Sequence, residues 1–135
     1  AVNIINTTNA GVASIGEVSG SDVYFAGGGG GCGDATPAGG VGGSGGTGGG
    51  GDGDSIYTDS GDPGIANTGG GGGGSRSLGS GGTGGGPGGS GVVILRYPSS
   101  FTISGLTEAT GSPFTEGASK VSVFTNVGTG NIQFN

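Results

Sequence analysis

Apolar residues gather near the two ends of the chain and leave its middle almost without them. In residues 1–25 apolar positions alternate with polar ones, and Gly11, Gly16 and Gly20 separate them. Alternation of this kind, punctuated by glycine, predicts short half-exposed β-strands joined by turns. We expect the last of these strands at residues 23–26. The earlier strand positions are Val2, Ile4, Val12, Ile15 and Val18.

The pattern after residue 91 is also that of β-structure. Residues 92–97 read as one apolar strand, and shorter alternating stretches follow at 101–103, 121–123 and 132–134. Glycines between these stretches supply the turns. No stretch has the apolar period of an α-helix. We therefore predict an all-β fold with short strands and no α-helix.

The middle of the chain, residues 26–91, holds 34 of the 42 glycines. Within it, side chains recur at every third position with two glycines between them. The clearest examples are Ala38, Val41, Ser44 and Thr47, and then Pro87 and Ser90. A period of three is that of the extended left-handed helix, which rises about 3.1 Å per residue. Collagen is excluded because its repeat needs abundant proline, and this chain has 5 prolines.

Glycine at two of every three positions allows other backbones to approach closely. The backbone N–H and C=O groups of such a helix point outward and need partners. The pattern therefore predicts a bundle of polyglycine-II helices hydrogen-bonded side by side, with a disordered Gly/Ser linker as the alternative. Ordering a residue costs roughly 1–2 kcal/mol, and a hydrogen bond returns about 0.5–1.5 kcal/mol. The bundle thus needs support from flanking strands or other subunits.

The chain divides into three parts along the sequence. They are an N-terminal β segment at 1–25, the glycine-rich bundle at 26–91 and a C-terminal β segment at 92–135. We expect one β-rich domain with the bundle inserted, and the strands 23–26 and 92–97 together at the bundle's base. Stretches that interrupt the glycine pattern are expected to be loops. These loops are 34–37, 52–67 and 75–78.

The charge balance narrows the classes of partner. The net charge is −6, and only Arg76, Arg96 and Lys120 are positive, which argues against binding to a nucleic-acid backbone. No run of 18 apolar residues is present, so no membrane span is predicted. No signal peptide is visible and methionine is absent, so we expect a processed product or a fragment. Cys32 is expected to be a small buried residue, with an intermolecular disulfide as the alternative.

Residues suited to catalysis are scarce. The sequence has no histidine, one cysteine and no Gly-x-Ser-x-Gly motif with partners, so we predict no enzyme activity and no cofactor. Asp52 and Asp54 begin like a calcium-binding loop. The twelfth position from Asp52, however, is Pro63 instead of the bidentate glutamate that such a loop needs. These two aspartates are the only calcium candidates, and no residue is a catalytic candidate.

Two stretches carry a resemblance to a known group of proteins. An apolar strand leads into Ala-Gly-Gly-Gly-Gly-Gly at 26–31, and residues 88–98 read Gly-Gly-Ser-Gly-Val-Val-Ile-Leu-Arg-Tyr-Pro. Together they resemble the glycine-rich domains of tailed-phage virion proteins, which are frequent in predicted tail-fibre and appendage proteins of aquatic phages. Residues 122–134 look like the β-repeat that often accompanies such domains. The resemblance covers most of residues 21–134.

The resemblance implies a non-enzymatic virion appendage protein, a tail fibre or tip adhesin. In similar adhesins the loops between glycine tracts contact a host receptor. Carried over, the receptor-contact candidates are Ile56, Tyr57, Asp59, Arg76 and Leu78. The implied location is the virion or the extracellular space. The implied partners are other copies in a trimer, other virion proteins, and a host receptor or glycan.

Two other functions stay open. A structural fibre or capsid-decoration subunit would assemble without binding a receptor. Ice binding is the third function, because glycine-rich antifreeze proteins use the same helix. Those proteins present a flat face, and Thr47 and Thr83 are too sparse to favour it.

Overall fold

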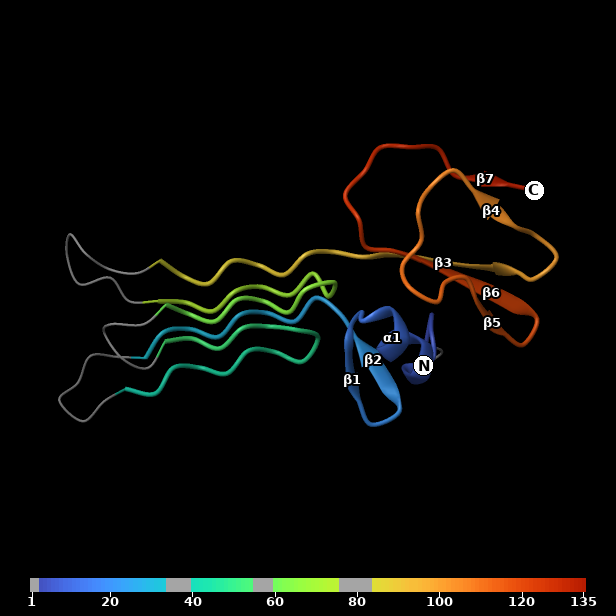
Figure 1. The fold of residues 1–135 in the computed structure, drawn as a ribbon. Coiled ribbons are helices and arrows are strands. Elements are labelled where there is room, and N and C mark those ends of the chain that lie inside the picture. The colour runs from blue at the N-terminus through green and yellow to red at the C-terminus, as the bar shows by residue number, and fades with distance from the viewer. Residues whose placement is uncertain (1–2, 34–39, 55–59, 76–83) are drawn as a thin grey trace. The chain divides into compact units, whose positions relative to one another are not determined.

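The computed structural model describes residues 3–33, 40–54, 60–75 and 84–135, and it divides into two compact units. Residues 1–23 and 92–135 form the first unit, and residues 24–91 form the second (Figure 1). The glycine-rich unit is therefore an insertion between the two segments that build the other unit.

The helices and strands of the described residues lie in the first unit, except that β2 extends to the first residue of the second, and they are mostly β-structure as predicted. The elements are α1 (Thr7–Ala13), β1 (Glu17–Ser19), β2 (Asp22–Tyr24), β3 (Val93–Pro98), β4 (Ile103–Ser104), β5 (Phe114–Glu116), β6 (Ser119–Phe124) and β7 (Gln133–Phe134). They form a β1–β2 pair, a three-stranded sheet in the order β3-β6-β5, and a β4–β7 pair. In the described part of the chain, no helix has the length and apolar character that crossing a membrane requires.

The three-stranded sheet carries much of the core. Its strands are antiparallel, and Val121 of β6 lies opposite both Arg96 of β3 and Phe114 of β5. The central strand β6 is buried from Val121 to Phe124. The buried apolar side chains of this unit are Ile5, Ala10, Ala13, Ile15, Tyr97, Phe114, Val121, Val123 and Phe124. Residues from both ends of the chain thus share one small core.

The helix α1 corrects the prediction that the chain has no α-helix. It begins after Asn6, whose side-chain oxygen accepts a hydrogen bond from the Asn9 N–H at 2.8 Å. It ends at Ser14, which adopts the left-handed conformation. Ala10 and Ala13 are its buried residues. Two alanines three positions apart are too few to produce a visible helical period, so Val12 was wrongly expected in a strand.

The strands that bracket the glycine block do not pair with each other. β2 pairs with β1, and β3 pairs with β6. Each bracketing strand therefore has its own partner, and the expectation that the two strands lie together at the base of the bundle stays a prediction. β2 pairs with β1, its neighbour in sequence, and all six residues of β3 pair with β6.

The second unit is a bundle of extended segments with a three-residue hydrogen-bond period. The described segments are residues 24–33, 40–47, 49–54, 60–66, 68–75 and 84–91. The period is clearest where N–H groups of the first segment reach the third. Gly27, Gly30 and Gly33 donate in turn to the carbonyls of Gly48, Gly51 and Asp54, at 2.9–3.0 Å. This is the predicted polyglycine-II arrangement, and Figure 1 shows the segments side by side.

Hydrogen bonds arrange the six segments in two staggered layers. Segments 24–33, 68–75 and 84–91 form one layer, and 40–47, 49–54 and 60–66 form the other. Segment 68–75 is central in its layer and bonds to four neighbours, two in each layer. Its hydrogen-bond partners belong to segments 24–33, 49–54, 60–66 and 84–91. Each layer thus covers one side of the other.

Glycine is required where a segment faces a neighbour. A Cβ placed on Gly30 would lie 1.8 Å from the Gly43 carbonyl oxygen, whereas one placed on Gly31 would meet nothing within 4 Å. Larger residues occupy outward positions such as Val41, Asp52 and Ile65, which are all exposed. Side chains recur at every third position because only one edge of each segment faces outward and has room for them.

The bundle includes residues that the sequence pattern assigned to the long loop at 52–67. Asp62 donates to the Asp52 carbonyl at 2.8 Å, and Ile65 donates to the Gly49 carbonyl at 2.9 Å. Only residues 55–59 of that predicted loop lie outside the described residues. An aspartate or isoleucine on an outward edge leaves the lattice intact, so a break in the glycine pattern need not be a loop.

Candidate functional site

One end of the bundle, called the distal end here, brings together residues far apart in sequence. The Gly33 N–H donates to the Asp54 carbonyl at 2.9 Å, and the Asp54 N–H donates to the Gly74 carbonyl at 2.9 Å. These three residues lie at or next to the last described position of their segments. Segments 24–33, 49–54 and 68–75, which run toward the distal end, therefore end side by side there.

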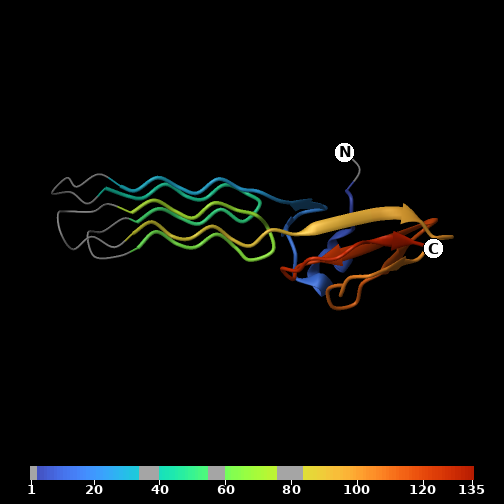
Figure 2. The same ribbon diagram turned by 90° about the horizontal axis from the view of Figure 1, so that it is seen from above.

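The returning segments begin at the same level. A Cβ placed on Gly33 would lie 2.5 Å from the Gly40 carbonyl oxygen. Cβ atoms placed on Gly61 and Gly85 would lie 2.2 and 3.1 Å from the Gly73 carbonyl oxygen. The described residues on either side of the three gaps, 34–39, 55–59 and 76–83, therefore lie at the distal end of the bundle, whose described segments are drawn in Figure 2.

The opposite end of the bundle is closed by short hydrogen-bonded turns at residues 47–49 and 66–69. In the second turn the Thr68 hydroxyl donates to the Ile65 carbonyl at 2.6 Å and accepts from the Gly70 N–H at 3.0 Å. The Ser90 hydroxyl accepts from the Asn67 N–H at 2.8 Å and donates to the Asn67 side-chain oxygen at 3.0 Å. Thr47, a candidate for ice binding, lies in the first turn. The side chains of Asn67, Thr68 and Ser90 therefore form hydrogen bonds that stabilise the turn and its neighbouring segment.

The receptor-contact candidates lie outside the described residues. They are Ile56, Tyr57, Asp59, Arg76 and Leu78. The residues that flank these candidates, next to the gaps 55–59 and 76–83, are described, and they lie together at the distal end of the bundle. The sequence pattern does not predict this convergence, because it does not show which segments are neighbours.

The calcium candidates Asp52 and Asp54 lie on different edges of one segment. Asp52 is exposed, and its Oδ1 atom accepts from the Gly45 N–H at 2.6 Å. Asp54 is 7 % exposed, and both its backbone N–H and its carbonyl are bonded to neighbouring segments. Within the described ranges, no group of three His, Cys, Asp or Glu side chains is suitably placed to hold a metal ion. The described aspartates therefore have structural roles in the lattice.

Cys32 is exposed, so the expectation that it is buried is wrong. It lies one residue before the last described position of its segment, near the distal end. It follows Ala26 and Gly29 at the three-residue period, and both of these residues are exposed as well. The thiol is therefore accessible to solvent.

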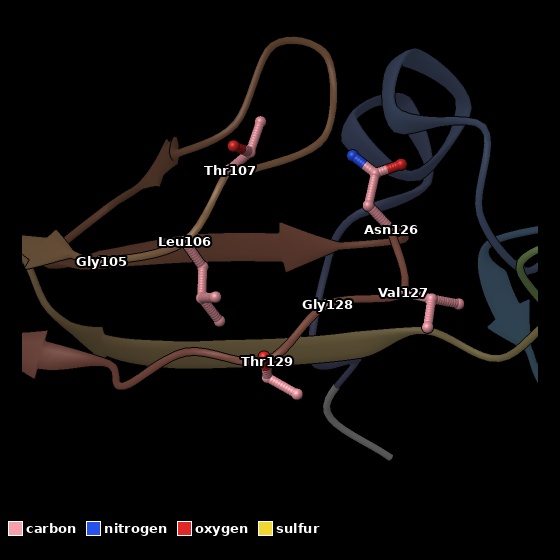
Figure 3. A pocket seen from close by; sticks show the side chains of 7 residues that line it. All are labelled: Gly105, Leu106, Thr107, Asn126, Val127, Gly128 and Thr129. Atoms are coloured by element: carbon pink, nitrogen blue, oxygen red, sulfur yellow. The ribbon is translucent and has the colours of Figure 1, made fainter.

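The first unit has an open pocket of about 350 Å³ between two loops (Figure 3). Its lining residues are Gly105, Leu106, Thr107, Asn126, Val127, Gly128 and Thr129. None of these side chains carries a charge, and Val127 is fully exposed. The pocket offers hydroxyl and amide groups to a neutral molecule but no acid, base or nucleophile pair.

A buried polar cluster links the sheet to the loop before β5. Ser122 donates to Glu108 Oε1 at 3.0 Å, so the Tyr97 hydroxyl, 2.9 Å from Ser122 Oγ, is the donor in that contact. The Ser112 hydroxyl donates to Glu108 Oε2 and accepts from the Val123 N–H at 2.9 Å. For the residues that the structure describes, every buried side-chain polar atom has a partner. The cluster is therefore satisfied internally and stabilises the fold.

Comparison with known families decides the classification. The model of a family described as a glycine-rich domain matches residues 3–98. The chain belongs to this glycine-rich domain family. Neither a curated protein nor a solved structure matches the chain.

The glycine-rich domain match ends with β3, whose strand partner lies beyond it. β3 ends at Pro98, and it pairs along its whole length with β6 (Ser119–Phe124). The matched region thus contains α1, β1, β2, the bundle and β3. In this protein the residues after 98 complete the sheet to which β3 belongs.

Glu116, which lies outside the match, holds the glycine-rich domain's N-terminal segment. Its Oε1 atom accepts from the Asn6 N–H at 2.9 Å and from the Asn9 side chain at 2.8 Å, and its Oε2 accepts from Arg96 at 2.7 Å. Burial alone raises the pKa of the Glu116 carboxyl group. The hydrogen bonds from Asn6, Asn9 and Arg96 and the Arg96 charge outweigh burial and lower that pKa. Glu116 is therefore a structural carboxylate.

Proposed function

We propose that this glycine-rich domain protein is a non-enzymatic appendage of a tailed-phage virion, a tail fibre or tip adhesin that contacts a host surface. The contact is made by the three connecting stretches at the distal end of the bundle. The ligand is a surface receptor or glycan of the host. The protein then works at the virion surface, outside the host cell.

The observation that supports this proposal is that the described residues flanking the three connecting stretches meet at the distal end of the bundle. Binding residues are often placed on loops that a scaffold positions. Here the scaffold is the two-layer bundle, with backbone hydrogen bonds of 2.7–3.0 Å between its segments. The candidates Ile56, Tyr57 and Asp59 belong to one stretch, and Arg76 and Leu78 belong to another. Tyrosine and arginine, present here as Tyr57 and Arg76, are enriched among the residues that supply most of the energy of a binding interface.

The test is adsorption of virions that carry the chain with substitutions in the candidate stretches. One variant combines Ile56→Ala and Tyr57→Ala, and the other is Arg76→Ala. We expect each to lower the rate of adsorption to host cells by about tenfold, which corresponds to 1.4 kcal/mol of binding. Particle yield and the incorporation of the protein should stay unchanged.

Ile65→Ala is the matched control. Ile65 is an isoleucine like Ile56, it is 51 % exposed, and it lies next to the turn at the end of the bundle opposite the distal end. Its loss should leave adsorption near the wild-type rate. Unchanged adsorption of the distal-end variants on intact particles would rule out host contact through these stretches.

A structural role is the second candidate function. In that case the chain is a fibre or capsid-decoration subunit, and the bundle stabilises an assembly of copies. The observation that favours it is the exposed glycine backbone of the layer formed by segments 24–33, 68–75 and 84–91. Loss of assembled particles in bundle variants, with normal adsorption by distal-end variants, would favour this role over the first.

A further inference from the structure

The outer side of the layer formed by 24–33, 68–75 and 84–91 consists mainly of glycine backbone. Segment 68–75 is central in this layer. In its residues 71–74, every backbone N–H and C=O is hydrogen-bonded except the two groups of Gly72, which have no partner among the described residues. Gly72 is also partly exposed. Its polar backbone groups therefore point to a position where the lattice lacks a neighbour.

Glycines on both neighbouring segments continue this surface. A Cβ on Gly29 would lie 1.9 Å from the Gly72 carbonyl oxygen, and one on Gly88 would lie 3.4 Å from the Gly70 carbonyl oxygen. In the described part of the chain, the N–H and C=O groups of Gly29 and Gly88 also lack hydrogen-bond partners. Gly29, Gly72 and Gly88 define a surface called the glycine face here.

The opposite layer presents a different surface. Its central segment, 49–54, carries the exposed Asp52, whose carboxylate accepts from the Gly45 N–H of the adjacent segment. The exposed Asp62 on the other adjacent segment is hydrogen-bonded through its N–H to the Asp52 carbonyl. Side chains and charge therefore prevent another backbone from approaching this layer.

We propose that the glycine face binds the glycine face of a second copy of this chain, so that two bundles of two layers form one lattice of four. Inside the bundle, glycine occupies the positions where a neighbouring backbone approaches most closely. A Cβ on Gly27, Gly30 or Gly53 would lie 1.8–2.1 Å from a neighbouring carbonyl oxygen. A partner for the glycine face must meet the same steric condition. The chain itself provides such a surface.

Charge supports the same pairing. The chain has a net charge of −6, so two copies repel each other in most orientations. The glycine face offers the N–H donors and C=O acceptors of Gly29, Gly72 and Gly88, and these three residues have no charged side chain. One patch that offers both kinds of group is self-complementary, as a two-fold interface requires. This association does not depend on the proposed host contact, because it uses the side of the bundle and not its distal end.

The test is self-association of the full chain measured by sedimentation over a range of concentrations. The variant combines Gly28→Ala and Gly88→Ala, because Cβ atoms there meet nothing within 4 Å and an ordinary contact at 3.4 Å, respectively. Gly88 belongs to the glycine face, and Gly28 is the exposed residue next to Gly29, so both methyl groups leave the bundle intact but add bulk where a second backbone would approach. We expect the dimer dissociation constant to rise by about tenfold or more. Added salt should strengthen association of the wild-type chain, because it screens the repulsion between acidic copies.

Ser44→Leu is the control, since Ser44 is an exposed residue of the opposite layer. It should associate like the wild type. Exchange of the Gly72 amide should slow as the wild-type concentration rises, and it should not slow in the Gly28/Gly88 variant. A wild-type chain that stays monomeric with and without salt would overturn the proposal. So would a Ser44→Leu variant that loses association while the Gly28/Gly88 variant keeps it.

Discussion

Arg96 donates a 2.7 Å hydrogen bond from Nη1 to Oε2 of Glu116 and forms an ion pair with it. The same Arg96 atom donates to the Ile4 carbonyl at 3.2 Å. Arg96 belongs to the matched glycine-rich domain, and Glu116 lies beyond its end at residue 98. The pair therefore joins the N-terminal segment, β3 and β5 across more than 100 residues of sequence.

Replacing Glu116 by glutamine should destabilise the first unit. Glutamine keeps the size of the side chain and can still accept from Asn6 and Asn9. Its NH₂ group, however, cannot accept from Arg96, and the charge is lost. Hydrogen bonds to a charged group contribute about 1.5–3 kcal/mol, but Arg96 is about one-third exposed, so we expect a loss of about 1–2 kcal/mol. Urea unfolding measures this loss, and Thr115→Ala, an exposed change on the same strand, should have little effect.

The lowered pKa of Glu116 predicts an acid-dependent loss of stability. The unfolded chain has a glutamate pKa near 4.3, and the folded pKa lies below its ordinary value. The stabilisation is therefore fully present above the unfolded pKa and is lost as the pH falls through the folded pKa. The difference in unfolding free energy between wild type and Glu116→Gln should be constant at pH 6–7 and shrink below about pH 4. A difference that stays constant down to pH 3 would contradict this assignment.

The sequence pattern predicts which positions of a glycine-rich segment face outward, but it does not predict which segments lie next to each other. Side chains at Val41 and Ser44 face outward as the period of three requires, because the period reports which edges of a segment are packed. The pattern does not show why residues 69–74 are all glycine. In the structure this run lies in the central segment 68–75, where neighbours surround most of its edges. That explanation depends on the order of the segments, which a local pattern cannot give.

The first unit shows the same limit. The strand at 92–97 is predicted from its apolar residues, and the structure has β3 at Val93–Pro98. The helix α1 is missed because its stability comes from contacts made elsewhere in the fold, such as Asn9 with Glu116. The distal end is missed for the same reason, since hydrogen bonds such as that from Gly33 to Asp54 determine it.

Ser122→Ala should destabilise the sheet through the buried cluster. The change removes the acceptor of the Tyr97 hydroxyl and one donor to Glu108, both in buried or partly buried positions. A buried polar group without a partner costs about 1–3 kcal/mol, and we expect a loss in this range by urea unfolding. Ser100→Ala, an exposed serine in the same unit, should leave stability within about 0.5 kcal/mol of wild type. Equal effects of the two changes would show that the cluster adds nothing to stability.

A pair of adjacent substitutions, Gly30→Ala and Gly31→Ala, tests the geometry of the bundle directly. The methyl group of Gly30→Ala would lie 1.8 Å from the Gly43 carbonyl oxygen, so the two backbones must move apart. That movement breaks the hydrogen bonds from Gly30 to Gly51 and from Gly74 to Gly30, both shorter than 3 Å. We expect a loss of about 1–3 kcal/mol or more, because overpacking of this kind displaces backbone.

Gly31→Ala should behave differently although it makes the same chemical change one residue later. Its methyl group meets nothing within 4 Å. Alanine also restricts the unfolded chain, so stability should be unchanged or up to about 1 kcal/mol higher. Amide exchange of Gly43 and Gly53, whose N–H groups bond within the bundle, reads out both variants. Faster exchange in Gly30→Ala only would support the packed edge at residue 30. Equal exchange in the two variants would contradict the three-residue lattice.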